Sequence, residues 1–235
     1  MTAVGHRKEI VSRVRRALSR RPRPVLSRLK GKLLSRTPEL DFWQERARDL
    51  GARAVFSIGH SDADLERVTA LQKQELYPRL RGARRGDEKL ILDLGCGTGR
   101  FTADPAELLG GRAVGIDPIA RLIELAPRGA TVDYRVMKPG SIPLESSSVD
   151  VIWSCLVLGG IRGELLDATI AEVKRVLRPG GLMFLAENTS KGMRSPVYFY
   201  LTIADYQRLL APIRLQHVHD YYDLEERISV MLGRR

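Results

Sequence analysis

The sequence predicts an α/β fold, in which helices cover both faces of a mostly parallel sheet of seven strands. From residue 89 onward, short apolar segments with the character of strands alternate with helical segments. The run Leu90-Ile91-Leu92 is unbroken in its apolar character, which is typical of a central strand in a parallel sheet. No clear helix separates the last two strand-like segments, so these two can pair antiparallel at one edge.

Length and composition indicate a single globular domain with an extension. The chain has 235 residues, of which 43% are hydrophobic and 29% are charged. No apolar run approaches the roughly 20 residues of a membrane span. Cys96 and Cys155 are the only cysteines, too few for a disulfide framework, so we expect a reducing compartment, most simply the cytoplasm.

The basic charge belongs to the first 36 residues. They contain twelve of the 39 basic residues and one of the 28 acidic residues, so they carry the whole formal excess of +11. We therefore divide the chain into a basic N-terminal extension (1–36), partly helical or disordered, and a folded domain (37–235). Such an extension can lie on an anionic membrane surface, contact phosphates, or remain a solvated tail. A peripheral membrane location is one expectation, and it depends on the extension alone.

Two helices are expected before the first strand, in residues 37–88, where they would form a lid over the core of residues 89–235. Thr37-Pro38 has the pattern of a helix N-cap followed by proline at the first helical position, and Gly51 is a stop signal. The segment Ser61-Asp62-Ala63-Asp64 opens the second helix, which we expect to end before Pro78.

The remaining elements follow in an alternating order. Their boundaries are set by glycine and proline, for example Gly110-Gly111 and Pro179-Gly180-Gly181. We predict strands at 89–93, 112–116, 131–136, 149–154, 182–187, 213–219 and 227–232, and helices at 100–109, 119–126, 164–177 and 204–210.

Three glycines at alternate positions follow the first strand directly. Gly95, Gly97 and Gly99 allow a sharp turn and a close approach of the backbone to a ligand. Ligands of open α/β sheets bind at the carboxyl ends of the strands. The spacing differs from the dinucleotide pattern and no phosphate-binding lysine follows, whereas Asp93 precedes the loop. A carboxylate at this position favours a cationic ligand over a phosphate.

The segment D-L-G-C-G-T-G resembles the first motif of class I S-adenosylmethionine-dependent methyltransferases. Asp117, at the end of V-G-I-D, is similar to the acidic residue with which this family binds the ribose, and V-D-V-I and V-L-R-P-G-G-L-M-F-L resemble its fourth and fifth strands. The resemblance covers residues 90–187 and implies a Rossmann-like fold with S-adenosyl-L-methionine as cofactor and no metal. Near Lys138 the sequence departs from the family pattern, in which an acidic residue often binds the adenine. We therefore expect backbone groups near residues 140–142 to bind the adenine. The implied cofactor-binding residues are Asp93, Gly95, Cys96, Gly97, Gly99, Asp117, Pro118, Ser141, Ile142, Ser154, Cys155 and Leu156.

The acceptor is less closely defined. After the fourth strand the sequence reads S-C-L-V-L-G-G, without the Asn/Asp-Pro-Pro-Tyr segment that the family uses to methylate amino groups of bases or glutamine. Because residues 37–235 are formally neutral, nucleic acid is also less favoured as a partner. We therefore expect O-methylation of a sugar, glycan or other hydroxylated small molecule. An RNA methyltransferase that uses the basic extension, and a non-catalytic scaffold, are the alternatives.

O-methylation calls for a base that removes a hydroxyl proton. The sequence offers three candidates: His60 before the second helix, His219 near the C-terminus, and Glu187 at the end of the fifth strand. His217 and His219 alternate on a predicted strand, so they would share one face and form either a metal pair or ordinary surface residues. Glu187 can instead cap the loop that follows it.

Overall fold

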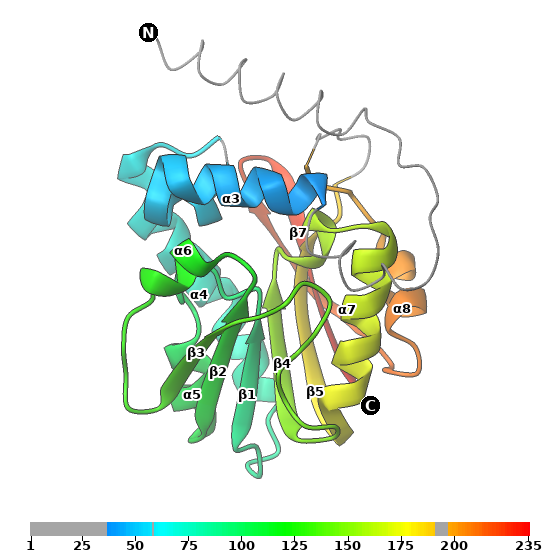
Figure 1. The fold of residues 1–235 in the computed structure, drawn as a ribbon. Coiled ribbons are helices and arrows are strands. Elements are labelled where there is room, and N and C mark those ends of the chain that lie inside the picture. Colours follow the sequence, from blue (N-terminus) through cyan, green and yellow to red (C-terminus); the bar gives the residue numbers. More distant parts are fainter. Residues whose placement is uncertain (1–36, 58, 191–196) are drawn as a thin grey trace, which may run out of the picture.

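The computed structural model describes residues 37–57, 59–190 and 197–235. A seven-stranded sheet with strand order β3-β2-β1-β4-β5-β7-β6 forms its centre (Figure 1). β7 is antiparallel to both of its neighbours, and the pairs among β1 to β5 are parallel. The predicted fold, with its antiparallel edge, is therefore confirmed. The strands are β1 (Leu90–Leu94), β2 (Arg112–Asp117), β3 (Val132–Val136), β4 (Val149–Cys155), β5 (Leu177–Asn188), β6 (Gln216–Asp223) and β7 (Glu226–Arg234).

Helices cover both faces of the sheet, as predicted. In Figure 1, α7 and α8 lie in front of the sheet and α4 and α5 lie behind it. Within the described part of the chain, no helix is long and apolar enough to cross a bilayer. The basic extension of residues 1–36 lies outside the described residues. The helices are α3 (Pro38–Leu50), α4 (Leu65–Ala83), α5 (Ala103–Leu109), α6 (Ala120–Glu124), α7 (Gly163–Val176) and α8 (Ile203–Leu210), with short 3₁₀ turns η1 (Gly51–Val55), η2 (Asp62–Asp64) and η3 (Leu158–Gly160).

The central strand β4 connects the two halves of the core. Because side chains alternate along a strand, Ile152 packs with α7 and α8, whereas Val151 and Trp153 pack with α4 and α5. The indole of Trp153 is fully buried and stacks on Phe184 of β5, with 4.3 Å between ring centroids. The core between the sheet and helices α4 and α5 therefore contains one large stacked aromatic pair.

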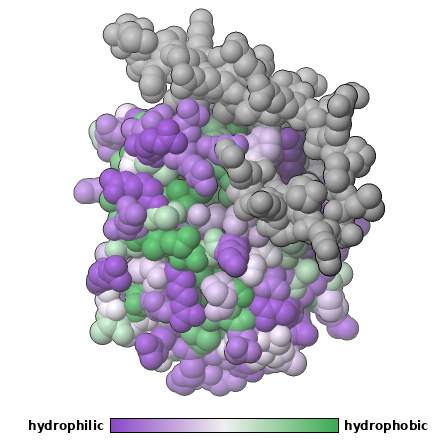
Figure 2. Space-filling model, in the orientation of Figure 1, coloured by the Kyte–Doolittle hydropathy of each residue, from purple (hydrophilic) through white to green (hydrophobic). Residues whose placement is uncertain are grey.

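Helix α3 begins and ends as the sequence predicts. The Thr37 hydroxyl accepts a hydrogen bond from the amide of Leu40 (3.3 Å), and Gly51 ends the helix at a positive φ of 55°. Leu40 and Phe42 are buried, and Figure 2 shows mainly hydrophilic residues on the outer side of α3. The helix thus lies across the carboxyl edge of the sheet with its apolar side inward (Figure 1).

The second helix is longer than predicted. Helix α4 continues through Pro78 to Ala83, so the expected end before the proline is wrong. Leu76 and Leu80, on either side of Pro78, are fully buried in the core. Burying two leucines contributes about 3–6 kcal/mol, which offsets the cost of about 3 kcal/mol of a proline inside a helix. Of the two helices expected to form a lid, α3 with η1 lies at the sheet edge, while α4 packs on the sheet.

The fifth strand starts earlier than predicted. β5 begins at Leu177, which pairs with Val149, and the register shifts before Leu182 pairs with Val151. The Pro179-Gly180-Gly181 segment is therefore an irregularity inside the strand and not a turn before it. Leu177 is fully buried, so its side chain holds the early part of the strand in the core.

Strand β6 lies three to four residues later in the chain than predicted, whereas β7 agrees with its predicted position to within two residues. The observed hairpin has Asp223 opposite Glu226, with Leu224 and Glu225 between them at positive φ values of 49° and 67°. Two positive φ values in a two-residue loop define a type I′ turn, which normally carries Asn-Gly, so the sequence lacked the usual signal. The result places Asp223 and Glu226 at the carboxyl edge of the sheet.

The other boundaries agree with the predictions to within a few residues. The largest difference is α5, which starts at Ala103 and not at residue 100, because residues 98–102 continue the loop as turns. The strand-and-helix order from β1 to α8 is unchanged.

We expect the Trp153→Ala substitution to lower the free energy of unfolding by about 3–5 kcal/mol, because it leaves a large cavity beside Phe184. Urea denaturation measures the change. Tyr222→Ala is the control, since this side chain is 64% exposed and its loss should change stability by about 0.5 kcal/mol or less. Equal effects of the two substitutions would contradict the described core.

Candidate functional site

The site lies at the carboxyl ends of β1 and β4, where the strand order reverses direction. This is the position at which open α/β sheets bind ligands. A cavity of about 140 Å³ opens there, between the glycine loop and the N-terminal segment. We call it the cofactor cavity. Its lining comprises Leu40, Trp43, Val55, Asp93, Gly95, Cys96, Gly97, Arg100, Phe101, Asp117, Pro118, Ile119, Leu122, Cys155, Leu156, Val157, Gly160 and Ile161.

The glycine loop needs its glycines for two reasons. Gly95 and Gly97 have positive φ values of 69° and 55°. A Cβ on Gly95 would lie 2.6 Å from the side chain of Val157, and one on Gly97 would lie 2.6 Å from that of Val55. The loop therefore has the β4–α7 connection on one side and η1 on the other.

Asp117 ties the glycine loop to the end of β2. Its Oδ2 accepts a hydrogen bond from the amide of Gly97 (3.0 Å), and its Oδ1 accepts one from the amide of Ile119 (2.8 Å). Burial raises the pKa of this carboxyl to about 6, although the two amide hydrogen bonds oppose the shift. Each oxygen keeps a second lone pair for a ligand hydroxyl.

Asp93 lies in the same cavity at the end of β1. Burial is the main cause that raises its pKa to about 7, and the nearby charge of Asp117 raises it further. The hydrogen bond from Thr102 (2.6 Å) and the positive charge of Arg100 oppose this shift without cancelling it. Two carboxylates with little access to water are costly to ionise unless a positive charge lies close to them. The cavity thus fits a cationic ligand with hydroxyl groups, which are the features of a sulfonium nucleoside.

The structure brings together eight of the predicted cofactor-binding residues in the cofactor cavity and places four elsewhere. The eight are Asp93, Gly95, Cys96, Gly97, Asp117, Pro118, Cys155 and Leu156. Burial raises the pKa of the Cys155 thiol to about 12, so this thiol is not a nucleophile near neutral pH.

The four residues outside the cavity lining have other surroundings. A Cβ on Gly99 would meet Tyr134 of β3, and Ser154 is fully buried. Ser141 is exposed, and the Ile142 amide already donates a hydrogen bond to Glu172 of α7 (2.8 Å). The backbone groups that we assigned to the adenine are therefore not in the cavity, because α7 binds this loop.

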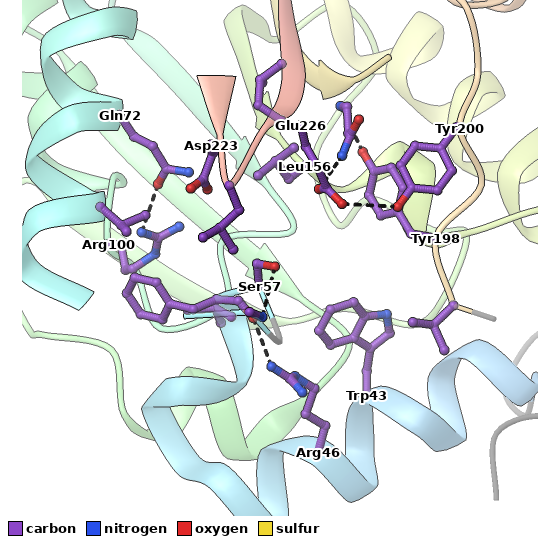
Figure 3. Close-up of a pocket in the computed structure, with 18 of the residues that line it drawn as sticks. Trp43, Arg46, Ser57, Gln72, Arg100, Leu156, Tyr198, Tyr200, Asp223 and Glu226 are labelled. Atoms are coloured by element: carbon purple, nitrogen blue, oxygen red, sulfur yellow. Dashed lines mark hydrogen bonds between the residues drawn. The ribbon is translucent and has the colours of Figure 1, made fainter. Parts of the chain in front are cut away.

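A second cavity of about 450 Å³ adjoins the first (Figure 3). We call it the acceptor cavity. It shares Trp43, Val55, Arg100 and Leu156 with the cofactor cavity. Its other lining residues are Phe42, Arg46, Phe56, Ser57, Gly59, Val68, Gln72, Asn188, Val197, Tyr198, Tyr200, Asp223, Leu224, Glu226 and Ile228. Leu156 has a positive φ of 60°, so an unusual backbone conformation brings this residue to the junction.

The polar residues of the acceptor cavity were mostly missed by the sequence analysis. Arg100 directly follows the glycine motif, and this adjacency was the one available signal. Arg46 was one of several arginines on a predicted helix. Asp223 and Glu226 flank the hairpin turn whose position was predicted wrongly. Tyr198 and Tyr200 belong to an aromatic cluster in the sequence that is compatible either with a wall that stacks on a sugar or ring, or with core packing.

Glu187 anchors the loop after β4. It is fully buried and accepts hydrogen bonds from the amides of Val157 (3.0 Å), Leu158 (2.7 Å) and Gly159 (3.3 Å) and from the hydroxyl of Tyr198. Burial raises the pKa of this carboxyl, and the hydrogen bonds oppose the shift. Glu187 lines neither cavity. Of the two roles that the sequence suggests, a base or a residue that caps a loop, the geometry therefore favours the second.

The histidine candidates are also engaged elsewhere. His60 is buried, and its Nε2 lies 2.9 Å from Asp223. His219 binds Glu75 of α4 (2.6 Å), and His217 binds Asp220 (2.8 Å). The expectation that His217 and His219 share one face is wrong, because the register of β6 shifts between them. Neither histidine of β6 lines a cavity, whereas His60 reaches the acceptor cavity through Asp223.

Comparisons with known proteins agree with this architecture. Residues 92–185 match a family described as a methyltransferase domain. The chain is 36% identical over 128 residues to a ubiquinone biosynthesis O-methyltransferase from Methylocella silvestris, which covers 51% of this chain and 46% of the relative. It is 32% identical over 127 residues to a malonyl-[acyl-carrier protein] O-methyltransferase from Yersinia pestis, with coverage of 54% and 44%. The chain thus spans less than half the length of these two relatives.

A solved structure shows the same fold. The geranyl diphosphate C-methyltransferase from Streptomyces coelicolor, in complex with Mg²⁺, geranyl diphosphate and S-adenosyl-L-homocysteine, aligns with a TM-score of 0.59 at 18% identity. The alignment covers 75% of this chain and 85% of that one. The predicted resemblance to class I methyltransferases and the assignment of S-adenosylmethionine as the family's cofactor are confirmed.

We expect Glu187→Gln to lower the free energy of unfolding by about 2–3 kcal/mol, because the new amide group would face backbone donors that need an acceptor. Chemical denaturation measures this loss. Glu145→Gln, at an exposed position, is the matched control and should leave stability unchanged. If both variants unfold alike, Glu187 does not anchor the loop.

Proposed function

We propose that this chain, whose residues 92–185 are a class I S-adenosylmethionine-dependent methyltransferase domain, transfers a methyl group to an oxygen atom of a small hydroxylated molecule. The observation that carries the proposal is the pair of adjoining cavities that share Trp43, Val55, Arg100 and Leu156. One cavity carries polar groups suited to the cofactor, and the other has the size of a small-molecule site, about 300–1,000 Å³. A sugar is one member of the proposed acceptor class.

The cofactor cavity supplies the groups that the cofactor needs. When bound, S-adenosylmethionine supplies an electrophilic methyl group on a positively charged sulfur. Asp117 would accept hydrogen bonds from the ribose hydroxyls, and the backbone of Gly95 and Gly97 would lie against the methionine part. Asp93 would balance the positive charge, since it lies in the same cavity with little access to water.

The N-terminal segment would close the site. Val55 of η1 lies over Gly97, and Trp43 of α3 lines both cavities. The cofactor cavity of about 140 Å³ is smaller than the roughly 300 Å³ of small ligand sites, so α3 and η1 would move outward when the cofactor enters. Their return would exclude water and hold the reactants in line, which lowers the barrier by several kcal/mol.

Glu226 is the side chain best placed to accept the hydroxyl proton. It lines the acceptor cavity, and its Oε2 accepts a hydrogen bond from Nδ2 of Asn188 (2.6 Å). Burial raises the pKa of this carboxyl, which makes its anion a stronger base than an exposed glutamate. Asp223, beside His60, is a second carboxylate on the same hairpin.

The two relatives named above are both O-methyltransferases, which supports oxygen as the proposed methylated atom, whereas the solved structure named above is a C-methyltransferase. Neither of their names refers to a sugar, and therefore the broader class of hydroxylated small molecules is proposed. The RNA hypothesis and the membrane contact depend on residues 1–36, so both stay predictions, as does the cellular location.

The two buried carboxylates predict a pH dependence of cofactor binding. As the pH falls from 8 to 6, Asp93 and then Asp117 become protonated in the free protein, so the affinity for the positively charged cofactor should fall about tenfold. S-adenosylhomocysteine, whose sulfur is neutral, should lose less affinity. Calorimetric titrations of both compounds measure the difference, and Asp93→Asn should reduce it. Equal pH profiles for the two compounds would contradict the charge role of Asp93.

A methyl-transfer assay tests the proposed reaction. Radiolabelled S-adenosylmethionine is supplied with a panel of phenols, catechols, hydroxy acids and sugars, and labelled methyl ethers or esters are expected with at least one of these classes. Glu226→Gln should lower kcat about 10²-fold while the affinity for S-adenosylhomocysteine stays unchanged, because Glu226 does not line the cofactor cavity. Glu225→Gln, at the exposed turn position, is the matched control. Label found only on nitrogen or carbon would overturn the proposal.

A further inference from the structure

In the part of the chain that the structure describes, two arginine side chains of the acceptor cavity form no ion pair. Arg46 donates hydrogen bonds to the carbonyls of Ala54 (2.8 Å) and Phe56 (2.9 Å). Arg100 donates to the hydroxyl of Thr69 (3.0 Å) and the side-chain carbonyl of Gln72 (3.0 Å). Among residues 37–57, 59–190 and 197–235, no carboxylate oxygen lies within 4.0 Å of either guanidinium group.

Both guanidinium groups are held where water solvates them poorly. Arg46 is only 7% exposed, and burial is the main cause that lowers its pKa to about 10. Burial also lowers the pKa of Arg100. The charge of Asp93, in the adjoining cofactor cavity, offsets part of this shift for Arg100, whereas the hydrogen-bond partners of Arg46 are all neutral. A buried cation without an ion-pair partner is destabilising to the fold unless a ligand supplies the negative charge.

Phe56 brings the two arginines to one wall of the cavity. Its carbonyl binds Arg46, and its ring lies 4.3 Å below the guanidinium of Arg100. In Figure 3, Arg46 rises from α3 and Arg100 enters from the side of the glycine loop, and both border the same space. The planar group of Arg100 is thereby fixed in orientation, as stacked arginines are in anion sites.

The carboxylates of the cavity cannot serve the arginines, because they have partners of their own. Asp223 lies 2.9 Å from the His60 imidazole, and Glu226 accepts from Asn188 (2.6 Å). Both belong to the β6–β7 hairpin, which forms the upper wall in Figure 3, with Tyr198 and Tyr200 beside it. The cavity is thus cationic where α3 and the glycine loop meet, and acidic at the hairpin.

We propose that the acceptor carries a carboxylate or a phosphate group, which binds between Arg46 and Arg100. This inference rests on the proposed function in that it takes this cavity as the acceptor site. An anion there forms charge-assisted hydrogen bonds with the free N–H groups of the guanidinium ions. The reactive hydroxyl then lies toward Leu156 and Glu226. With a neutral acceptor, Arg46 has only its neutral hydrogen-bond partners, and Arg100 has only the charge of Asp93 in the adjoining cavity.

The fluorescence of Trp43, which lines the cavity, provides a test that needs no knowledge of the acceptor. The full-length protein is titrated at pH 8 and constant ionic strength with benzoate, with phenyl phosphate, and with benzamide as the neutral analogue. We expect saturable binding of at least one anion, about tenfold or more tighter than that of benzamide. Comparison of the two anions shows whether a carboxylate or a phosphate is preferred.

Variants assign the binding to the two arginines. Arg46→Gln and Arg100→Gln should each remove most of the preference for the anion, whereas Arg46→Lys and Arg100→Lys, which keep the charge, should retain part of it. Arg67→Gln is the control, because this side chain is 78% exposed and pairs only with Asp64. Far-UV circular dichroism and urea denaturation verify that each variant is folded, because Arg100 also lines the cofactor cavity and its variants can change S-adenosylhomocysteine binding directly.

The outcomes separate this inference from the proposed function. Anion binding that is lost in the glutamine variants supports the anion site even if the methyl-transfer panel yields no product. If the wild-type protein binds neither anion, or binds the anions no more tightly than benzamide, the anion site is overturned. The proposed function would still stand in that case if the assay shows methylation of a neutral hydroxyl compound.

Discussion

The arrangement of the site depends on keeping Asp93 and Asp117 buried at the ends of adjacent strands. β1 and β2 are in parallel register, so Asp93 lies opposite Gly115 and the two carboxylates reach the same crevice. Thr102 and two backbone amides bind them, but these neutral donors do not replace water fully, and the pKa of each carboxyl stays raised. Arg100 lowers the pKa of Asp93 but does not cancel the shift, so in the proposed function a positively charged cofactor would stabilise both carboxylates further.

The remainder of the site comes from the two ends of the described chain. Residues of α3 and η1 form one wall, and the β6–β7 hairpin forms the opposite wall of the acceptor cavity. Both lie outside the matched family region of residues 92–185. In the proposed function, the region shared with relatives supplies most of the cofactor cavity, and the flanking segments supply most of the acceptor cavity.

The sequence predicted the cofactor side of the site better than the acceptor side, for a physical reason. Asp93, Gly97 and Asp117 are fixed by local patterns, because a strand end and a tight turn follow from a few adjacent residues. Arg46, Arg100 and Glu226 come from segments far apart in the chain, and no local sequence pattern predicts that they line one cavity. The hairpin that carries Glu226 was also shifted, since Leu224 and Glu225 occupy a turn that usually holds asparagine and glycine.

The four residues that face both cavities have an energetic consequence. A ligand that moves Leu156 or Arg100 from one side changes the walls met by a ligand on the other side. Thermodynamic reciprocity then requires that each ligand alter the affinity for its neighbour by one common factor. The shared wall would thus couple the two cavities directly, with no distant regulatory site involved.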